Sequence, residues 1–356
     1  MQTSHTLLIG DARDLSAVEA GSVQLVVTSP PYPMIEMWDE TFGALDPGVP
    51  ALLEAGEGMA AFERMHAALD AVWAGCAQAL APGGLLCVNI GDATRSLRGE
   101  FCLYPNHVRL SLALMRLGLT PLPDVLWRKP TNAPNKFMGS GMLPGGAYVT
   151  YEHEYILIFR KGGKRAFGPA DRARRTASAY FWEERNLWFS DLWTDLRGAD
   201  QRLGPHGGRA RSAAFPFELP WRLIHMYALQ GDRVLDPFVG TGTTMAAALA
   251  AGRSSVGVEL DPSLQPLVGD SLQRALLEGP ARAAGRLRAH AAAMAARAAA
   301  GKPAAHRVEA YDLPVITRQE TGLRLLVPTD LRAVEGGWTA DHAPAPTPPR
   351  LGAASG

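Results

Sequence analysis

The sequence has little that would suit a secreted or membrane-spanning protein. Its three cysteines, Cys76, Cys87 and Cys102, are odd in number and lack paired spacing, so we expect reduced core thiols in a cytoplasmic protein. The N-terminus lacks the basic and apolar segments of a secretory signal. No apolar run approaches the roughly 18 residues that cross a bilayer. We therefore expect a cytoplasmic location and no membrane partner.

The chain also lacks net charge, since 35 basic residues match 35 acidic ones. This balance argues against a surface coated with charge that binds nucleic acid, although a local basic run lies between Arg160 and Arg175. A solvated loop with scattered charge is an equally good interpretation of that run. With 356 residues, of which 47% are hydrophobic, the chain can bury one large core plus an appended lobe.

Predicted strands and helices alternate along much of the chain. The strand Val23–Val27 is almost wholly apolar, which is typical of a strand buried on both faces of a parallel sheet. A short helix should precede Gly21, a loop should cover 33–58, and a long helix should run from Pro262 towards Ala300. The other predicted strands are 6–9, 85–90, 124–127, 234–236 and 255–259, and the other helices 60–80, 106–117, 218–229 and 243–251. This alternation predicts a doubly wound α/β fold with a mostly parallel sheet.

The alternation breaks between Lys129 and Ser212, where turn residues, aromatics and arginines dominate apart from a strand at Glu154–Arg160. We interpret this stretch as an inserted lobe. The segments 308–316 and 323–327 suggest a β-hairpin near the C-terminus. The predicted organisation is a first half of the main domain at 1–128, the lobe at 129–212, the second half with its following helix at 213–300, an extension at 301–342, and a disordered Pro/Ala-rich tail at 343–356.

A strand late in the chain enters a glycine-rich turn that opens a helix, in the segment 236–244, Asp-Pro-Phe-Val-Gly-Thr-Gly-Thr-Thr. Such a turn lets backbone N–H groups approach a nucleotide-like ligand. Glu259 ends the next strand, 19 residues after Gly240, where an acid usually accepts hydrogen bonds from a ribose diol. Met245 stands where a dinucleotide-binding pattern has its third glycine, so there is less provision for a pyrophosphate. A nicotinamide oxidoreductase is therefore a distant alternative.

A second motif, Thr28-Ser29-Pro30-Pro31-Tyr32, follows the apolar strand near the start. The oxygens of Ser29 Oγ and the Pro30 carbonyl are suited to accept the two N–H bonds of an exocyclic amino group on a flat ring. The prolines fix the backbone and remove competing donors, and Tyr32 offers a face on which the ring can stack. In isolation the tetrapeptide 29–32, Ser-Pro-Pro-Tyr, is more often a plain turn. Its value as evidence comes from the strand before it and from the glycine-rich turn.

Together the two motifs resemble the β-class (permuted) S-adenosylmethionine-dependent DNA amino-methyltransferases, the N4-cytosine/N6-adenine family, in which the chemical motif precedes the cofactor motif. The resemblance spans 7–262 and includes the stretches 88–92, 126–130, 152–157 and 215–220. It implies a Rossmann-like methyltransferase fold in permuted order with an inserted target-recognition lobe. Serine at the first motif position is associated in this family mainly with N4 methylation of cytosine, and aspartate with N6 methylation of adenine. The implied substrate is a base flipped out of duplex DNA.

The resemblance also assigns site residues. The expected catalytic residues are Ser29, Pro30, Pro31 and Tyr32. The expected residues around S-adenosylmethionine are Asp11, Ala12, Thr28, Phe215, Pro216, Glu218, Leu219, Asp236, Pro237, Phe238, Gly240, Thr241, Gly242, Thr243, Thr244 and Glu259. The expected DNA-binding residues of the lobe are Lys129, Asn132, Asn135, Lys136, Arg160, Lys161, Lys164 and Arg165. For Asp11, an Asx turn is nearly as good an interpretation as a cofactor contact.

Several alternatives stay open at the level of the sequence. N6-adenine methylation is the nearest, and a non-catalytic subunit that binds cofactor and DNA is a more distant one. Carbon-5 methylation is disfavoured because no cysteine follows a proline. The glutamates that flank His153 lack the partners of a metal site, so alternation along a strand explains them better. The expected partner is double-stranded DNA in the nucleoid, and a restriction endonuclease partner and a homodimer are left open.

Overall fold

The computed structural model describes residues 1–129, 138–139, 142–198 and 215–347 of the chain. A ten-stranded sheet forms its centre, in the order β10-β6-β9-β3-β2-β11-β12-β1-β16-β15. In chain order these strands are β1 (Gln2–Ile9), β2 (Val23–Thr28), β3 (Leu80–Ile90), β6 (Leu119–Arg128), β9 (His153–Lys161), β10 (Leu192–Trp193), β11 (Arg233–Asp236), β12 (Ser254–Glu259), β15 (Leu326–Val334) and β16 (Gly337–Pro344).

The middle of the sheet is parallel and buried on both faces. β3, β2, β11, β12 and β1 run in the same direction, and β9 lies antiparallel between β3 and β6. Side chains of β2 alternate between two cores: Val26 belongs to one, Leu25 and Val27 to the other, and none is more than 1% exposed. The prediction of a strand covered on both sides is therefore confirmed.

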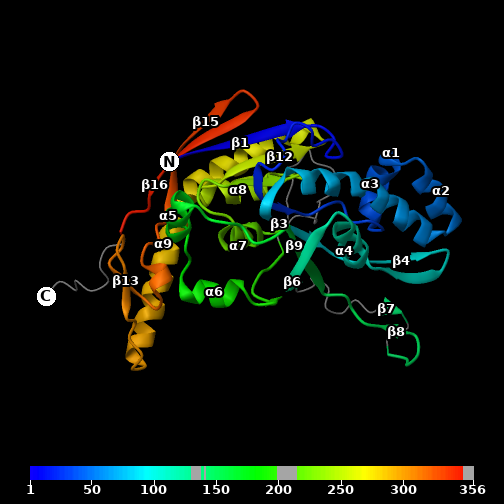
Figure 1. The fold of residues 1–356 in the computed structure, drawn as a ribbon. Coiled ribbons are helices and arrows are strands. Elements are labelled where there is room, and N and C mark those ends of the chain that lie inside the picture. The colour runs from blue at the N-terminus through cyan, green and yellow to red at the C-terminus, as the bar shows by residue number, and fades with distance from the viewer. Residues whose placement is uncertain (130–137, 140–141, 199–214, 348–356) are drawn as a thin grey trace.

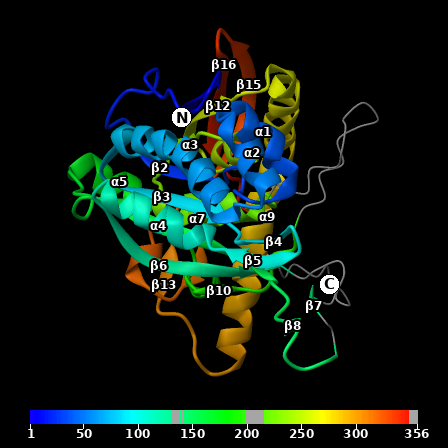
Figure 2. The same cartoon turned by 90° about the vertical axis from the view of Figure 1, so that its right-hand side faces the viewer.

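Helices cover both faces of the sheet (Figures 1 and 2). The core that contains Val26 also contains side chains of α3 (Gly58–Ala79) and α4 (Asn106–Arg116). The opposite core is formed with α7 (Glu218–Tyr227), α8 (Thr243–Ala250) and α9 (Gln265–Ala299). Since α3 leads from β2 to β3 on one face and α8 leads from β11 to β12 on the other, the winding reverses between β2 and β11. Ligands bind to open α/β sheets beyond the carboxyl ends of the strands at such a reversal.

Two sequence predictions in the first half are wrong. The segment after β1 forms successive turns in place of the short helix expected before Gly21. The segment 33–58, expected as a loop, contains a 3-10 turn at Glu36–Trp38 and the helices α1 (Asp39–Leu45) and α2 (Gly48–Ala55). Some of its prolines and glycines mark helix ends: Pro47 precedes α2, and Gly56 closes it in the left-handed conformation at φ 81°. A hairpin of β4 (Ala93–Leu97) and β5 (Glu100–Tyr104) follows β3.

The predicted lobe is not one continuous insertion. Its strand, β9, belongs to the centre of the sheet, and the two-residue β10 pairs with β6 at the sheet's edge. What lies outside the sheet is a projection with the short strands β7 (Met138–Gly139) and β8 (Ala147–Tyr148), together with α5 (Pro169–Ala177) and α6 (Trp182–Trp188). Figure 1 shows β7 and β8 extending away from the body of the molecule.

The C-terminal extension differs from its predicted hairpin. β13 (His306–Val308) pairs with β14 (Leu313–Val315), whereas β15 pairs with β16 and this hairpin lengthens the main sheet beyond β1. The long predicted helix is present as α9, and Gly279 within it lies so close to β15 that a Cβ there would be 2.6 Å from Pro328. The tail predicted to be disordered begins within β16, and Ala345 is buried. Within the described ranges, none of the helices combines the length and the apolar character that a membrane span requires.

Candidate active site

The two motif corners lie side by side at the reversal point of the sheet. β2 and β11 are adjacent parallel strands, with Leu25 opposite Val234 and Val26 opposite Leu235. At their carboxyl ends the Thr28 hydroxyl donates a 2.6 Å hydrogen bond to Oδ1 of Asp236, across a sequence separation of 208. Non-local pairing thus brings Ser29 next to the start of the glycine-rich turn.

Asp236 is a buried carboxyl that anchors the glycine-rich turn. Besides the Thr28 hydroxyl, its Oδ1 accepts the backbone N–H of Phe238 at 3.0 Å. Burial raises the pKa of Asp236 to about 6, with the Glu259 charge adding to the increase, while hydrogen bonds from Thr28, Thr244 and Phe238 act in the opposite direction. These hydrogen-bond donors offset the free-energy cost of burying a carboxyl group.

The glycine-rich turn has the conformation that its glycines predict. Gly240 and Gly242 have φ of 54° and 86°, and a Cβ at Gly242 would approach the Val268 backbone to 3.1 Å. A Cβ at Gly240 would meet no atom within 4 Å, so the turn has open space on that side. The Glu259 carboxylate accepts the backbone N–H of Gly240 at 2.8 Å and that of Asp261 at 2.9 Å. Carboxylate oxygens are the type of acceptor that a ribose diol would need.

Three further cofactor predictions have mixed outcomes. Asp11 lies beside this turn because the N–H of Gly10 donates to the Glu259 carbonyl, but the Asp11 carboxylate holds Arg13 in an Asx turn and an ion pair at 2.6 Å. Ala12, the residue after Asp11, is buried. The start of α7 packs in the same core as β2, through Phe215 and Leu219.

Glu218, at the start of α7, has a protein partner in this structure, and its assignment to the cofactor stays a prediction. Its Oε1 accepts a hydrogen bond from Arg222 one turn later at 3.0 Å, and Arg222 also pairs with Asp195. The Glu218 carboxylate therefore braces a buried arginine. Pro216 and Phe217 precede α7, and the Phe217 ring lies 4.0 Å from the Arg282 guanidinium on α9.

The serine–proline corner is tied into a hydrogen-bond network. Ser29 Oγ lies 3.1 Å from the Tyr32 hydroxyl, which in turn lies 3.0 Å from Oε2 of Glu154 on β9. Asn89, on β3, donates through Nδ2 to the Tyr32 oxygen at 2.8 Å and to Glu154 at 2.6 Å. Lys129, just after β6, donates to Oε1 of Glu154 at 2.5 Å. Pro30 is buried and Pro31 half-buried beside this network.

Asn89 and Glu154 are site residues that the sequence analysis did not assign, although both lie in stretches it singled out. Gly91, two residues after Asn89, packs so closely that a Cβ there would be 3.1 Å from the Tyr32 ring and 3.2 Å from Glu154. Asp92 braces the rim of the site by accepting hydrogen bonds from the His107 ring at 2.7 Å and the Tyr151 hydroxyl at 2.9 Å.

The structure does not bring the basic run together with this site. Because β9 is antiparallel to β3, Arg160 lies opposite Leu85, roughly 16 Å along the strand from Tyr155 and towards the amino ends of the parallel strands. Arg160 donates to the Gly162 carbonyl, and Lys161 donates to the Leu80 carbonyl at 2.7 Å.

The two other residues of that run that were expected to bind DNA, Lys164 and Arg165, are at the same edge. Arg165 pairs with buried Asp232 just before β11, and Lys164 is exposed. All four residues therefore lie away from the serine–proline corner, and their assignment as DNA-binding residues stays a prediction. Asn132, Asn135 and Lys136 lie outside the described residues.

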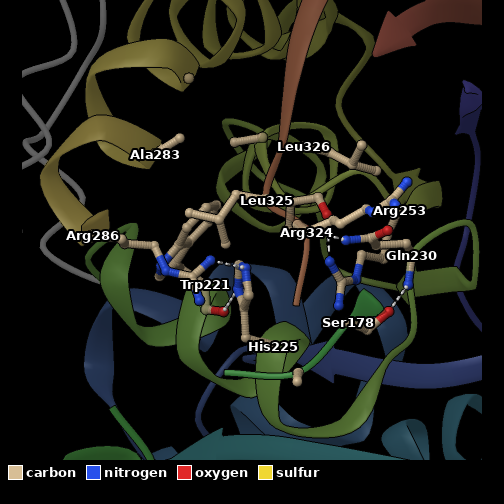
Figure 3. Close-up of a pocket in the computed structure, with 14 residues that line it drawn as sticks. Ser178, Trp221, His225, Gln230, Arg253, Ala283, Arg286, Arg324, Leu325 and Leu326 are labelled. Atoms are coloured by element: carbon tan, nitrogen blue, oxygen red, sulfur yellow. Dashed lines mark hydrogen bonds between the residues drawn. The ribbon is translucent and has the colours of Figure 1, made fainter. Parts of the chain in front are cut away.

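A small cavity near the amino ends of β11 and β12 is lined by both polar and apolar side chains and does not suit a cofactor (Figure 3). Its volume of about 20 Å³ accommodates roughly one water molecule. Arg286 donates to the His225 ring at 3.0 Å, and the Ser178 hydroxyl accepts the Gln230 N–H at 2.8 Å. Arg253, at the same cavity, donates to the carbonyls of Ala228 and Ala251. Structural hydrogen bonds thus occupy these groups, far from Thr28.

Comparisons with known proteins show the family of this chain. A DNA methylase family model (N6/N4) matches residues 23–268. Type II methyltransferase M.MthZI of Methanothermobacter thermautotrophicus is 47% identical over 337 residues, which are 94% of this chain and 94% of that protein. Type II methyltransferase M.MjaI of Methanocaldococcus jannaschii is 47% identical over 281 residues, 76% of this chain and 91% of that protein.

A solved structure shows the fold as well. The crystal structure of a putative DNA modification methylase from Thermus thermophilus, complexed with S-adenosyl-L-methionine, superimposes with a TM-score of 0.60 at 32% identity, covering 76% of this chain and 94% of that one. The predicted Rossmann-like α/β fold with a mostly parallel sheet is confirmed. The chain therefore belongs to the N6/N4 family of DNA methylases, enzymes that depend on S-adenosyl-L-methionine.

Proposed function

We propose that this chain is a permuted, β-class methyltransferase that transfers a methyl group to the exocyclic N4 of a cytosine flipped out of duplex DNA. The observation that carries the proposal is the hydrogen bond between Thr28 and Asp236, because it joins the serine–proline corner to the glycine-rich turn at one reversal point. The chemical corner comes first in the chain and the cofactor corner second, which is the permuted order. Serine at position 29 favours cytosine over adenine through the family resemblance.

The residues around the turn fit S-adenosyl-L-methionine. Gly240 leaves open space where a side chain would stand, and Glu259 presents carboxylate oxygens beside that space. We assign the ribose to Glu259 and the backbone approach of the cofactor to the segment 240–244. The bound cofactor supplies an electrophilic methyl group on a sulfonium and, having no pyrophosphate, needs no third glycine at Met245.

The serine–proline corner fits the amino group of the base. The nitrogen lone pair of cytosine N4 is delocalised into the ring, so acceptors that hold both N–H groups aim the nitrogen at the methyl. Ser29 Oγ and the Pro30 carbonyl are these acceptors in the proposal. In a direct, in-line displacement the N4–methyl bond forms as the sulfonium–methyl bond breaks, S-adenosylhomocysteine leaves, and the nitrogen then loses one proton to solvent. Burial raises the pKa of the Cys76 and Cys87 thiols, which disfavours these two cysteines as nucleophiles for a covalent intermediate.

The test is to incubate the protein with labelled S-adenosyl-L-methionine and mixed duplex DNA, digest to nucleosides and separate the methylated products. We expect N4-methylcytosine. N6-methyladenine as the sole product would move the assignment to adenine, and absence of any methylated base under conditions where the cofactor binds would favour the non-catalytic subunit. A Ser29→Ala variant is the matched control, and sequencing of methylated DNA identifies the recognition site. The homodimer and the endonuclease partner rest on the resemblance alone.

A further inference from the structure

We propose that Glu154 and Lys129 are positioning residues that act through Tyr32 on Ser29, so that the serine hydroxyl presents its lone pairs to the amino group of the substrate. This inference rests on the proposed function, since it concerns the same site. It assigns Lys129 a role different from the DNA contact that its place in the sequence suggests.

The charges at one end of the network fix the direction of every hydrogen bond in it. Lys129 is a donor only and the ionised Glu154 carboxylate is an acceptor only, and they meet at 2.5 Å. The Tyr32 hydroxyl, 3.0 Å from Oε2 of Glu154, must therefore donate to the carboxylate. Burial and the Glu154 charge raise the pKa of Tyr32 well above its ordinary value, so the phenol keeps the proton that it donates.

The lone pairs of the Tyr32 hydroxyl oxygen then accept hydrogen bonds from two donors. Its oxygen accepts one hydrogen bond from Nδ2 of Asn89 at 2.8 Å and one from the Ser29 hydroxyl at 3.1 Å. Asn89 Nδ2 and the Tyr32 O–H both point to the Glu154 carboxylate. If Tyr32 donated its proton to Ser29 instead, a lone pair of the Tyr32 oxygen would face the Glu154 carboxylate oxygen with no hydrogen between them. That arrangement costs a buried hydrogen bond. The serine hydrogen is thus committed to Tyr32, and both serine lone pairs are free to accept.

This direction is what the proposed reaction requires. An exocyclic amino group offers two N–H donors, and a serine that donated its own hydrogen would compete with them. Asn89 gives a second indication that the site lacks a hydrogen-bond donor that a ligand could supply. It is 3% exposed, and its Nδ2 donates to Tyr32 and Glu154. Its Oδ1 is buried and has no partner among the described residues. An acceptor in such a position is costly unless a ligand supplies a donor.

Lys129 completes the arrangement by neutralising Glu154. The Glu154 side chain is 13% exposed and the Lys129 side chain 31% exposed, so the pair is shielded enough for its charge balance to affect the network. The Lys129 ammonium also lies 4.9 Å from the Trp127 ring centre, which holds it at the end of β6. Three strands, β3, β6 and β9, therefore contribute to the orientation of one serine.

The first experiment is a double-mutant cycle on Ser29→Ala and Tyr32→Phe, measured in single-turnover methylation of duplex DNA. Tyr32→Phe keeps the ring but removes the hydroxyl, and we expect each variant to slow the methyl-transfer step by about 100-fold. The double variant should be no slower than Ser29→Ala, because Tyr32 acts through the serine. The KM for DNA and the affinity for cofactor should change by less than about twofold. Independent, multiplicative losses in the double variant would overturn the inference.

The second experiment tests the charged pair with Glu154→Gln, Lys129→Met and their combination. Each single change leaves one charge without its partner, and we expect kcat to fall about tenfold. The combined variant restores neutrality, and its glutamine carbonyl can still accept from Tyr32, so kcat should recover to within about threefold of wild type. The control is Glu152→Gln, which alters a carboxylate nearby on the same segment that pairs with Arg128.

The outcomes separate this inference from the proposed function. A wild-type protein that methylates no base contradicts the proposed function. Suppose instead that the wild-type protein methylates DNA. The positioning role alone is then contradicted if the combined charge variant does not recover kcat, or if the charge variants lose activity only through KM for DNA. Thermal unfolding of each variant, expected within a few degrees of wild type, excludes a loss caused by misfolding.

Discussion

The hydroxyl of Thr28 and the carboxylate of Asp236 are joined by a 2.6 Å hydrogen bond between the carboxyl ends of two adjacent parallel strands. One residue ends the strand before the substrate corner, and the other starts the cofactor turn. The bond therefore couples the geometry of the two halves of the site. Its strength is also coupled to the ionisation of Asp236, which is buried and depends on its donors.

Loss of the Thr28 hydroxyl should weaken both halves together. We expect Thr28→Val to reduce the free energy of unfolding by about 1–3 kcal/mol, because a buried carboxylate loses a donor while the side-chain shape is kept. The affinity for S-adenosyl-L-methionine should fall as the turn loses its anchor. Calorimetry of cofactor binding and thermal unfolding measure the two effects. Thr28→Ser keeps the oxygen and should retain most of both, and equal behaviour of the two variants would contradict the role of the hydroxyl.

The stability of the protein should carry a pH signature of Asp236. Its pKa in the folded state is about 6, above the ordinary value near 3.8, so the folded protein holds this proton more tightly than the unfolded chain does. The stabilisation from the protonated form is present at low pH and is lost as the pH rises from about 4 through about 6.

Comparison of wild type with Asp236→Asn isolates this contribution from the other carboxyl groups. Between about pH 5 and pH 7, the range around the folded-state pKa, we expect the melting temperature of wild type to decline relative to that of the asparagine variant. Parallel pH profiles would show that the Asp236 carboxyl has an ordinary pKa.

Gly91 should be sensitive to the smallest added side chain. In Gly91→Ala the Cβ would lie 3.1 Å from the Tyr32 ring and 3.2 Å from the Glu154 side chain, so one of the two must move. We expect about a tenfold or greater loss of kcat with little change in cofactor affinity. Gly163→Ala is a suitable control, since a Cβ there meets nothing within 4 Å. An active Gly91→Ala enzyme would show that the Tyr32 network tolerates displacement.

The basic run at the far edge of the sheet should contribute to stability and not to DNA affinity. Lys161→Met removes the donor to the Leu80 and Gln78 carbonyls, and we expect a loss of about 1–3 kcal/mol in the free energy of unfolding. The slope of the logarithm of the DNA-binding constant against the logarithm of salt concentration should stay unchanged. Loss of a residue that neutralises a phosphate would lower the magnitude of that slope by about one. A reduced slope for Lys161→Met would restore the DNA contact predicted from the sequence.

The sequence was most informative where local pattern and chemistry agreed. The apolar run 23–27 and the short strand before Asp236 indicated buried parallel strands, and the turn chemistry after each of them indicated what the strand ends carry. Their adjacency is a non-local feature that the pairing of β2 with β11 shows. The strand at 153–161 was recognised, but its position between β3 and β6 depends on antiparallel pairings that no local pattern reveals.

Two features could not be predicted from local sequence for physical reasons. In 33–58 the helix-breaking residues stand mostly at the ends of short helices, so counting prolines and glycines suggested a loop. The position of the basic residues 160, 161, 164 and 165 relative to the active site depends on the direction of β9, which their closeness in sequence does not reveal. A strand running away from the active site separates them from it, and carbonyl and carboxylate partners at the opposite edge engage three of the four. The network of Asn89, Glu154 and Lys129 joins three strands and could be seen only once their register was known.

The hairpin of β15 and β16 determines what the sheet exposes to other molecules. By pairing with β1, it converts a regular strand that could add a further chain into an interior one. The new outermost strand carries Pro328, a register shift before Asp330, and the charged side chain of Arg332. At the opposite margin of the described sheet, β10 has only two residues. At the β15 boundary these features leave no long, flat template for strand addition, so the extension disfavours self-association of the sheet through that edge.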